Sequence, residues 1–302
     1  MENTRAKTTR NSLILLLTAT IWGMAFVSQS KGMDYMHPFT FNGVRSLIGA
    51  AGILVYILIS RKIAGDKATK LDWKLNVRAG LLCGIFLTIA STLQQFGIKY
   101  TSVGKAGFIT TLYIIFVPMF GIFLKKKVAP VVWAAAGMAA VGMYLLCMTE
   151  SLRLGAGDIM VFLCAIAFAI QIMTVDHYAA RIDGAVVSCI QFTVCGVVCC
   201  IGALIWGQPT FGQIQEGLGA LLYAGVLSCG VGYTLQMNPT VAALIMSLES
   251  VIATISGWIA YKIGFLSTDQ TLTPRQIAGC VIVFAAVILV QLPPEWFRFG
   301  KK

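Results

Sequence analysis

Residues 185–207 read AVVSCIQFTVCGVVCCIGALIWG and carry no formal charge over their whole length. As a helix rising 1.5 Å per residue, this segment would be roughly 35 Å long, enough to cross the hydrocarbon core of a bilayer. A strand with open edges cannot face lipid, because its backbone polar groups would lose their hydrogen bonds. The segment therefore predicts a transmembrane helix.

Nine further apolar segments predict nine more spans, and composition supports this interpretation. Only 12% of the 302 residues are charged and 58% are hydrophobic, whereas soluble domains have about 25% charged residues. This composition excludes a typical soluble enzyme, a disordered chain and a disulfide-built secreted module. We expect an all-α membrane protein with ten transmembrane helices at Ser12–Ser30, Phe39–Ser60, Ala79–Ile98, Ala106–Leu124, Val128–Met148, Ile159–Val175, Ala185–Gly207, Gly217–Met237, Thr240–Tyr261 and Gln276–Leu292.

The distribution of positive charge predicts the orientation. Sixteen of the 23 Lys and Arg residues lie on the side of the N-terminus, six lie on the other side, and Arg45 lies within a span. Cytoplasmic loops are enriched in Lys and Arg, so we expect both termini in the cytoplasm. The net charge of +11 is then a topology signal, and no nucleic-acid partner is expected.

Weak internal similarity predicts that the chain is duplicated. At an offset of 136 residues Ala106 aligns with Ala242, Leu112 with Leu248, and Gly121 with Gly257, in the same order along the chain. We assign residues 1–150 to a first five-helix repeat and residues 151–302 to a second. Because five is odd, the second repeat is inverted, which is typical of secondary transporters with a central binding site.

The connection between the eighth and ninth spans is unusually short. Only Asn238 and Pro239 separate them, and two residues are at the short limit for joining antiparallel helices. Either the eighth helix ends early or residues are missing between Met237 and Asn238; we favour the second.

Glu249 is the strongest candidate for a functional residue. Burying a carboxyl group deep in a membrane span is costly, and such residues usually face a cavity and have a function. It could exchange protons during transport, bind an ammonium group of a substrate, or form a static interaction. The repeat aligns it with Tyr113, which we expect to face the same cavity. Arg45, in the second span, could gate, bind an anion, pair with Glu249, or reach the interface.

Amides and aromatic side chains within the spans are further candidates for substrate binding. Gln94 and Gln236 are related by the repeat, and Gln171 lies in the sixth span; each could instead bond to a neighbouring helix. Aromatic rings could surround an amine, an aromatic amino acid or a flat heterocycle, or simply pack. The aromatic candidates are Trp22, Phe26, Tyr233 and Trp258. The nine cysteines lie in apolar runs and are expected to pack, and no metal or cofactor is expected.

The ordered set of motifs resembles the drug/metabolite transporter superfamily, EamA-type. It comprises Trp22-Gly23, Pro38, Arg45, Tyr100-Thr101-Ser102, Val117-Pro118, Ser247-Leu248-Glu249-Ser250 and Gly257. The resemblance implies a permease of the bacterial cytoplasmic (inner) membrane that moves a small metabolite. It also implies a cavity lined mainly by helices one, three, four, six, eight and nine, with helices five and ten at the periphery.

Together these patterns predict a secondary active transporter rather than an enzyme. No G-x-x-x-x-G-K-[ST] phosphate loop is present to couple ATP directly. We expect alternating access, a small solute such as an amino acid, an amine or a nucleobase-like compound, protons as a coupling ion through Glu249, and a monomer or a homodimer formed through peripheral helices. The alternatives are a multidrug or lipophilic-cation exporter and a non-transporting membrane sensor.

Overall fold

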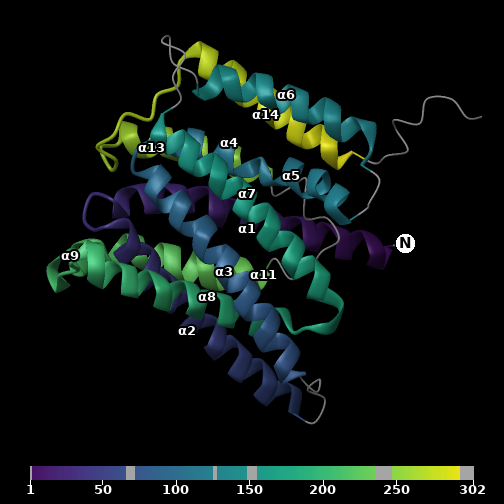
Figure 1. Ribbon diagram of the computed structural model, residues 1–302, viewed down its shortest axis with the longest axis vertical. Helices are drawn as coiled ribbons and strands as arrows, with labels where there is room; N and C mark the ends of the chain where they lie inside the picture. The colour runs from purple at the N-terminus through teal and green to yellow at the C-terminus, as the bar shows by residue number, and fades with distance from the viewer. Residues whose placement is uncertain (1, 66–71, 125–127, 148–154, 236–246, 293–302) are drawn as a thin grey trace, which may run out of the picture.

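The computed structural model describes residues 2–65, 72–124, 128–147, 155–235 and 247–292. Within these ranges every regular element is a helix (Figure 1). The first half contains α1 (Glu2–Gly32), α2 (Pro38–Ala64), α3 (Trp73–Ile98), α4 (Val103–Thr111), α5 (Tyr113–Phe120), η2 (Gly121–Leu124) and α6 (Pro130–Cys147). The second half contains α7 (Ala156–Tyr178), η3 (Ala179–Arg181), α8 (Gly184–Gly202), η4 (Ala203–Gly207), α9 (Phe211–Glu216), α10 (Leu218–Leu222), η5 (Tyr223–Gly232), α11 (Tyr233–Leu235), α13 (Leu248–Lys262) and α14 (Pro274–Gln291).

The prediction of an all-helical membrane protein is confirmed. Five helical segments are long and apolar enough to cross a membrane, and they cover Pro38–Ile63, Trp73–Ile98, Val103–Phe123, Ala156–Arg181 and Gly184–Gly207. Shorter apolar helices cover Pro130–Leu146, Leu218–Gly232 and Pro274–Val290. Helix α3 begins six residues before the predicted apolar span because the Asp72 side chain accepts a hydrogen bond from the Leu75 N–H and caps it.

The packing of the helices repeats across the two halves. Three helices pack on their own repeat equivalents: α2 on α8, α6 on α14, and α4 on α13. Other major contacts come in related pairs: α3 packs on α7 as η5 packs on α1, and α3 packs on α8 as η5 packs on α2. Likewise, α1 packs on α13 as α7 packs on α4 and α5. Correspondence among these main contacts is what a pseudo-two-fold axis between inverted repeats produces.

Helices α6 and α14 lie side by side at one edge of the molecule (Figure 1). Their contact is close because two glycines face each other's backbone. A Cβ atom at Gly142 would lie 2.9 Å from the Gly279 carbonyl oxygen, and one at Gly279 would lie 2.7 Å from the Gly142 carbonyl oxygen. Both distances are too short for a side chain, so this pair of helices depends on glycine at its crossing point.

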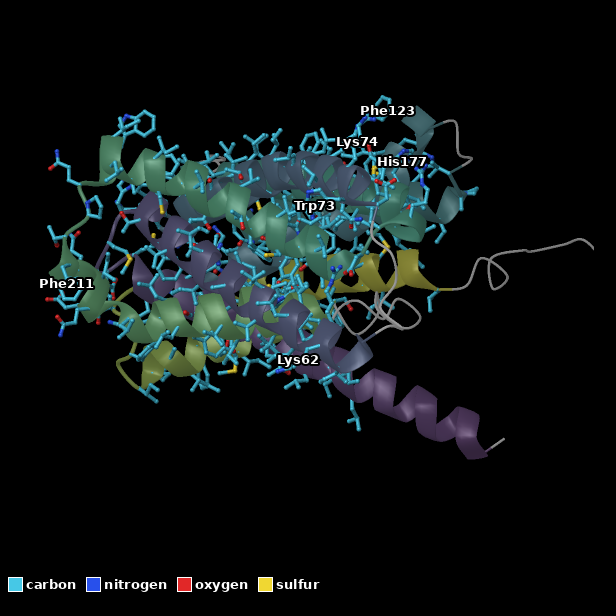
Figure 2. All side chains as sticks on the ribbon, turned by 90° about the horizontal axis from the view of Figure 1, so that it is seen from below. Lys62, Trp73, Lys74, Phe123, His177 and Phe211 are labelled. Carbon is cyan, nitrogen blue, oxygen red and sulfur yellow. The ribbon has the colours of Figure 1, made fainter. Side chains whose placement is uncertain are left out.

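The helical bundle has two opposite ends, which we call the turn end and the lock end. The turn end holds the α7–α8 turn, where Arg61 forms an ion pair with Asp183. The lock end holds the first turns of α4 and α7 and the loop before α14. Figure 2 shows Phe211 at one extremity and His177 towards the other.

The ninth predicted span is only partly described. Helix α13 begins at Leu248 and ends at Lys262, one residue beyond the predicted Tyr261. Residues 240–246 of that span lie outside the described residues, as does the Met237–Asn238 junction at which we expect missing residues. The eighth span is helical from Leu218 to Leu235, but ten of these residues, Tyr223–Gly232, form a π-helix.

Candidate functional site

A cavity of about 400 Å³ lies between the two halves. Helices α1, α2, α3, α4 and α5 line it from the first half, and α7, α8, η5, α11 and α13 line it from the second. The expected contributors are therefore present, but α2 and α8 contribute as well. Its polar and aromatic lining residues are Trp22, Phe26, Gln29, Arg45, Ser46, Ser91, Gln94, Thr110, Tyr113, Phe168, Gln171, Asp176, Ser188, Gln191, Phe192, Ser228, Tyr233 and Glu249.

Glu249 and Tyr113 both line this cavity, and each lies in the first turn of a helix. Glu249 lies in the first turn of α13 and is 8% exposed. Tyr113 begins α5, directly after the helix is interrupted at Leu112. Because α4 packs on α13 about the pseudo-two-fold axis, the two side chains enter the cavity from related positions. The carboxylate of Glu249 makes no hydrogen bond to any described residue, so it is available to a solute or a proton.

Arg45 lies on α2, is 5% exposed and lines the cavity. Its Nε atom donates to Oδ1 of Asn42 at 3.0 Å. The Asn42 amide is itself oriented, because its Nδ2 atom donates to Ser91 Oγ at 3.0 Å and to Cys199 Sγ at 3.3 Å. Asn42 therefore fixes where the guanidinium points, and Arg45 does not reach the interface as a snorkelling side chain would.

The candidate glutamines that the structure describes line the cavity and also join neighbouring helices. Gln94 donates to Thr110 Oγ1 at 3.3 Å, and Gln171 donates to Gln191 Oε1 at 2.9 Å; all four residues line the cavity. Each pair joins two helices and keeps further hydrogen-bonding capacity. Gln236 lies outside the described residues.

The aromatic candidates are only partly brought together. The Trp22 and Tyr233 rings lie 5.2 Å apart and the Phe192 and Tyr233 rings 4.6 Å apart, all lining the cavity. Trp22 is held by a 3.1 Å hydrogen bond from its Nε1 to the Ser228 carbonyl oxygen. The suggestion that Trp258 lines the cavity is wrong, because its position on α13 leaves it 48% exposed on the outer surface.

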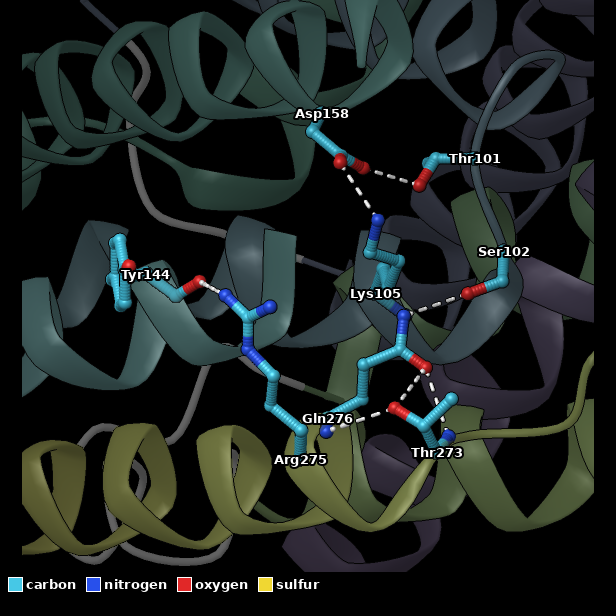
Figure 3. Close-up of polar contacts among 8 residues, drawn as sticks. All are labelled: Thr101, Ser102, Lys105, Tyr144, Asp158, Thr273, Arg275 and Gln276. Carbon is cyan, nitrogen blue, oxygen red and sulfur yellow. Dashed lines mark hydrogen bonds and ion pairs between the residues drawn. The ribbon is translucent and has the colours of Figure 1, made fainter. Parts of the chain in front are cut away.

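An ion pair joins the two halves at the lock end (Figure 3). Lys105 Nζ at the start of α4 lies 2.7 Å from Asp158 Oδ2 at the start of α7. The Lys105 side chain is 16% exposed and that of Asp158 is 4% exposed. Thr101 donates a further hydrogen bond to the same carboxylate. We call Thr101, Lys105 and Asp158 the lock, because their contacts join the N-terminal ends of two cavity-lining helices, α4 and α7.

Two further contacts close the lock end around this pair. The Val103 N–H donates to Gln270 Oε1 at 2.7 Å, which ties α4 to the loop before α14. Lys31 Nζ lies 5.5 Å from the centre of the Phe265 ring, which ties the end of α1 to the same loop. At the other end the cavity lining extends to Asp176, Ala179 and Gly184 at the α7–α8 turn. The cavity therefore approaches the surface at the turn end.

Two cysteines do more than pack. Cys195 and Cys199 are buried on α8, and the sulfur of Cys195 lies 3.4 Å from Ser46 Oγ and 3.3 Å from Ser91 Oγ. The expectation of purely apolar packing is wrong for these two residues, because their sulfur atoms take part in the polar network behind Arg45. No group of three or more His, Cys, Asp or Glu side chains that could hold a metal occurs among the described residues.

Sequence reasoning missed the two networks that surround the cavity. Asn42 carried a weak signal, because it is a polar residue one helical turn before Arg45 in an otherwise apolar span. Lys105 and Asp158 had only the appearance of flanking charges. Their partnership depends on how α4 and α7 meet in space, which no local pattern reveals.

Comparison with known proteins settles the family. The profile of the EamA-like transporter family matches residues 10–148 and, separately, residues 155–292. The chain belongs to the EamA-like transporter family. The two matches follow one another along the chain, as expected for a duplicated protein, and they place it within the drug/metabolite transporters.

Relatives of similar length carry transporter names without a substrate. An uncharacterized transporter of Archaeoglobus fulgidus is 27% identical over 290 residues, covering 92% of this chain and 84% of that protein. The uncharacterized transporter YwfM of Bacillus subtilis is 24% identical over 294 residues, covering 94% of each. A crystal structure of a protein 16% identical in sequence superposes with a TM-score of 0.66 over 96% of this chain and 99% of that one, and so shares the fold.

Proposed function

We propose that this EamA-like transporter is a secondary active transporter that moves a small metabolite across the cytoplasmic membrane by alternating access. One observation carries the proposal: a buried carboxyl group, Glu249, enters a cavity shared by two inverted halves without a hydrogen-bonding partner among the described residues. A buried ionisable group in a membrane protein usually marks a transport pathway.

The packing supports a second state of the same molecule. The cavity is closed at the lock end and approaches the surface at the turn end. Because the halves are related by a pseudo-two-fold axis, the two halves can exchange arrangements and open the lock end instead. With the N-terminus in the cytoplasm, as the charge distribution predicts, the cavity described here faces the cytoplasm.

Glu249 is the group we expect to couple transport to a gradient. Its carboxyl group can hold a proton or face a solute ammonium, and a change of accessibility between the two states would let it load on one side and unload on the other. Tyr113 lies at the related position and supplies a hydroxyl group and a ring face to the same solute.

A lipophilic-cation exporter is the second candidate. The cluster of Trp22, Phe192 and Tyr233 favours it, because aromatic faces attract organic cations. Arg45 disfavours it, since a buried guanidinium repels a cation in the same cavity.

The test begins with purified protein and pools of metabolites and of lipophilic cations in a thermal-shift screen. A stabilising compound is then followed into liposomes that contain the protein, with and without a pH gradient. We expect saturable flux that the gradient accelerates and that falls at least tenfold in Glu249→Gln. Glu216→Gln removes an exposed carboxylate of the same type and should leave flux unchanged. Flux that is equal in wild type and Glu249→Gln would refute the proposed role.

A further inference from the structure

A second hollow, which we call the outer groove, lies apart from the central cavity. It has a volume of about 460 Å³, and no described residue lines both. Helix α7 forms its floor with residues at the i, i+3, i+4, i+7 and i+8 positions of one helical face. They are Ile170, Met173, Thr174, His177 and Tyr178. At 1.5 Å per residue the floor is about 12 Å long, close to the depth of one leaflet of the hydrocarbon core, about 15 Å.

Two apolar walls border this floor, because α3 and α5 both pack on α7. Leu82 and Phe86 of α3 form one wall, and Phe120 and Phe123 form the other. The Phe120 ring lies 5.8 Å from the Phe116 ring and 6.1 Å from the Phe123 ring, so the second wall is a continuous row of rings. Such walls fit a hydrocarbon chain and give a polar solute little to bind.

The outer groove opens towards lipid. Exposed apolar side chains flank it on α3, including Leu81 and Ile85, and Phe123 at its edge is 83% exposed. Trp73 is exposed at the start of α3, and exposed Trp residues are enriched where a membrane meets water. With the N-terminus in the cytoplasm, as the charge distribution predicts, the groove therefore runs from the headgroup level into the cytoplasmic leaflet.

The mouth of the outer groove is basic. Lys74 and Arg78 lie on α3, about two helical turns and one helical turn before its first wall residue, and Arg181 follows the floor by one turn. All three are exposed, and none forms an ion pair within the described part of the chain. Of the acidic residues nearby in sequence, Asp72 caps α3 and Asp176 lines the central cavity instead.

From this arrangement we propose that the outer groove binds a phospholipid with an anionic headgroup. One acyl chain lies along α7, and the phosphate lies near Lys74, Arg78 and Arg181. The apolar part cannot select one lipid, because every bilayer lipid offers the same hydrocarbon. Selection comes from the mouth, since basic side chains at the membrane surface attract anionic lipid and Arg matches the geometry of a phosphate. The proposal does not rest on the proposed function, because neither transport nor the central cavity enters it.

Basic residues that only set the topology would not distinguish this place from others on the same side of the membrane. Lys62 provides the comparison, because it is exposed in the last turn of α2 on that same side. Figure 2 shows it well away from Lys74 and Phe123. Lys62→Gln therefore removes the same charge outside the outer groove and is the matched control.

Native mass spectrometry of the purified, delipidated protein measures the binding directly. The probes are dioleoyl phosphatidylglycerol and dioleoyl phosphatidylcholine, which share their chains and differ in net charge, and glycerol phosphate, which has no chains. We expect phosphatidylglycerol to bind at least tenfold more tightly than phosphatidylcholine, and glycerol phosphate not to bind. A phosphatidylglycerol with a photoreactive group in its acyl chain should label peptides covering residues 120–124 and 170–178.

Variants then separate the mouth from the floor. Arg78→Gln should weaken phosphatidylglycerol binding about fivefold and leave phosphatidylcholine unchanged, because each basic residue near the surface contributes about that factor. Replacing Lys74, Arg78 and Arg181 together with Gln should make the two lipids bind alike. Thr174→Phe places a ring on the floor and should weaken both lipids, whereas Lys62→Gln should bind as wild type does.

The proposal is overturned if the two lipids bind wild type equally, if the label falls outside the outer groove, or if Lys62→Gln loses as much affinity as Arg78→Gln. A wild-type dimer that carries no lipid would also overturn it, because a second copy would then cover the groove. Most of these results need only the wild-type protein, so a poorly folded variant cannot obscure them. Lipid binding at the groove without solute flux would support this proposal and contradict only the proposed function.

Discussion

Removing one side chain of the lock should open the lock end of the transporter. In Asp158→Asn the Lys105 ammonium loses a carboxylate 2.7 Å away, and Thr101 loses a charged acceptor. Breaking a buried ion pair by removing one partner costs about 3–5 kcal/mol. Because Lys105 is 16% exposed and can recover some hydration, we use the lower end, about 3 kcal/mol.

The cost falls on the state in which the lock is closed. Opening the lock end hydrates both groups, so the open state is nearly indifferent to the substitution. Since about 1.4 kcal/mol corresponds to a tenfold change, we expect the open fraction to rise by roughly 100-fold. In the sequence, the repeat relates Asp158 to Ser12 and Lys105 to Val241, and neither Ser12 nor Val241 is charged. The lock therefore has no charged counterpart that would set the resting state at the other end.

Hydrogen–deuterium exchange measures this opening directly. Peptides covering residues 99–108 and 155–163 should exchange much faster in Asp158→Asn, while peptides from α6 keep their wild-type rates. Asp183→Asn removes a half-buried carboxylate from an ion pair at the turn end, keeps a side chain that can cap α8, and should leave the lock end unchanged. The charge exchange Lys105→Asp with Asp158→Lys should restore slow exchange. Unchanged rates at the lock end, or equal acceleration everywhere, would show that the pair does not act as a lock.

Two further outcomes follow from packing and charge. Gly142→Ala should lower stability by about 1–3 kcal/mol, because the added Cβ would meet Gly279 and Val283. Gly137→Ala places its Cβ in open space and should raise stability by up to about 1 kcal/mol. Thermal unfolding in detergent compares the two variants, and equal effects would contradict the assigned contact. Burial, and then the charge of Lys99, lower the pKa of His37, so the unfolded chain binds a proton more readily and stability should fall as pH drops below about 6.5. His37→Asn should flatten this dependence between about pH 7.5 and about pH 5 in the same assay, and an unaltered pH profile would exclude His37 as its source.

Much of the fold was accessible from the sequence because a membrane imposes a simple rule. An apolar run long enough to cross must be helical, so α8 was predicted to within a residue of its start. Helix ends were less accurate, because capping residues such as Asp72 extend helices past the apolar run. The repeat also related Glu249 to Tyr113, which the cavity does bring together.

The rest depended on tertiary arrangement. Nothing local distinguishes Trp22, which lines the cavity, from Trp258, which lies on the surface, because both are aromatic residues in apolar helices. Arg45 donates a hydrogen bond to Asn42 on its own helix, and Asn42 in turn donates to Cys199 on α8. Such networks combine residues with no common sequence pattern, and only the crossing of the helices brings them together.

The central claim is that a solute crosses the membrane through the cavity that contains Glu249. Its most direct test is uptake, into liposomes containing the protein, of the labelled compound that most stabilises the purified transporter. The account predicts saturable uptake by wild type and by Glu216→Gln, and at least tenfold slower uptake by Glu249→Gln. Uptake equal to that of empty liposomes, or unaltered uptake in Glu249→Gln, would contradict it.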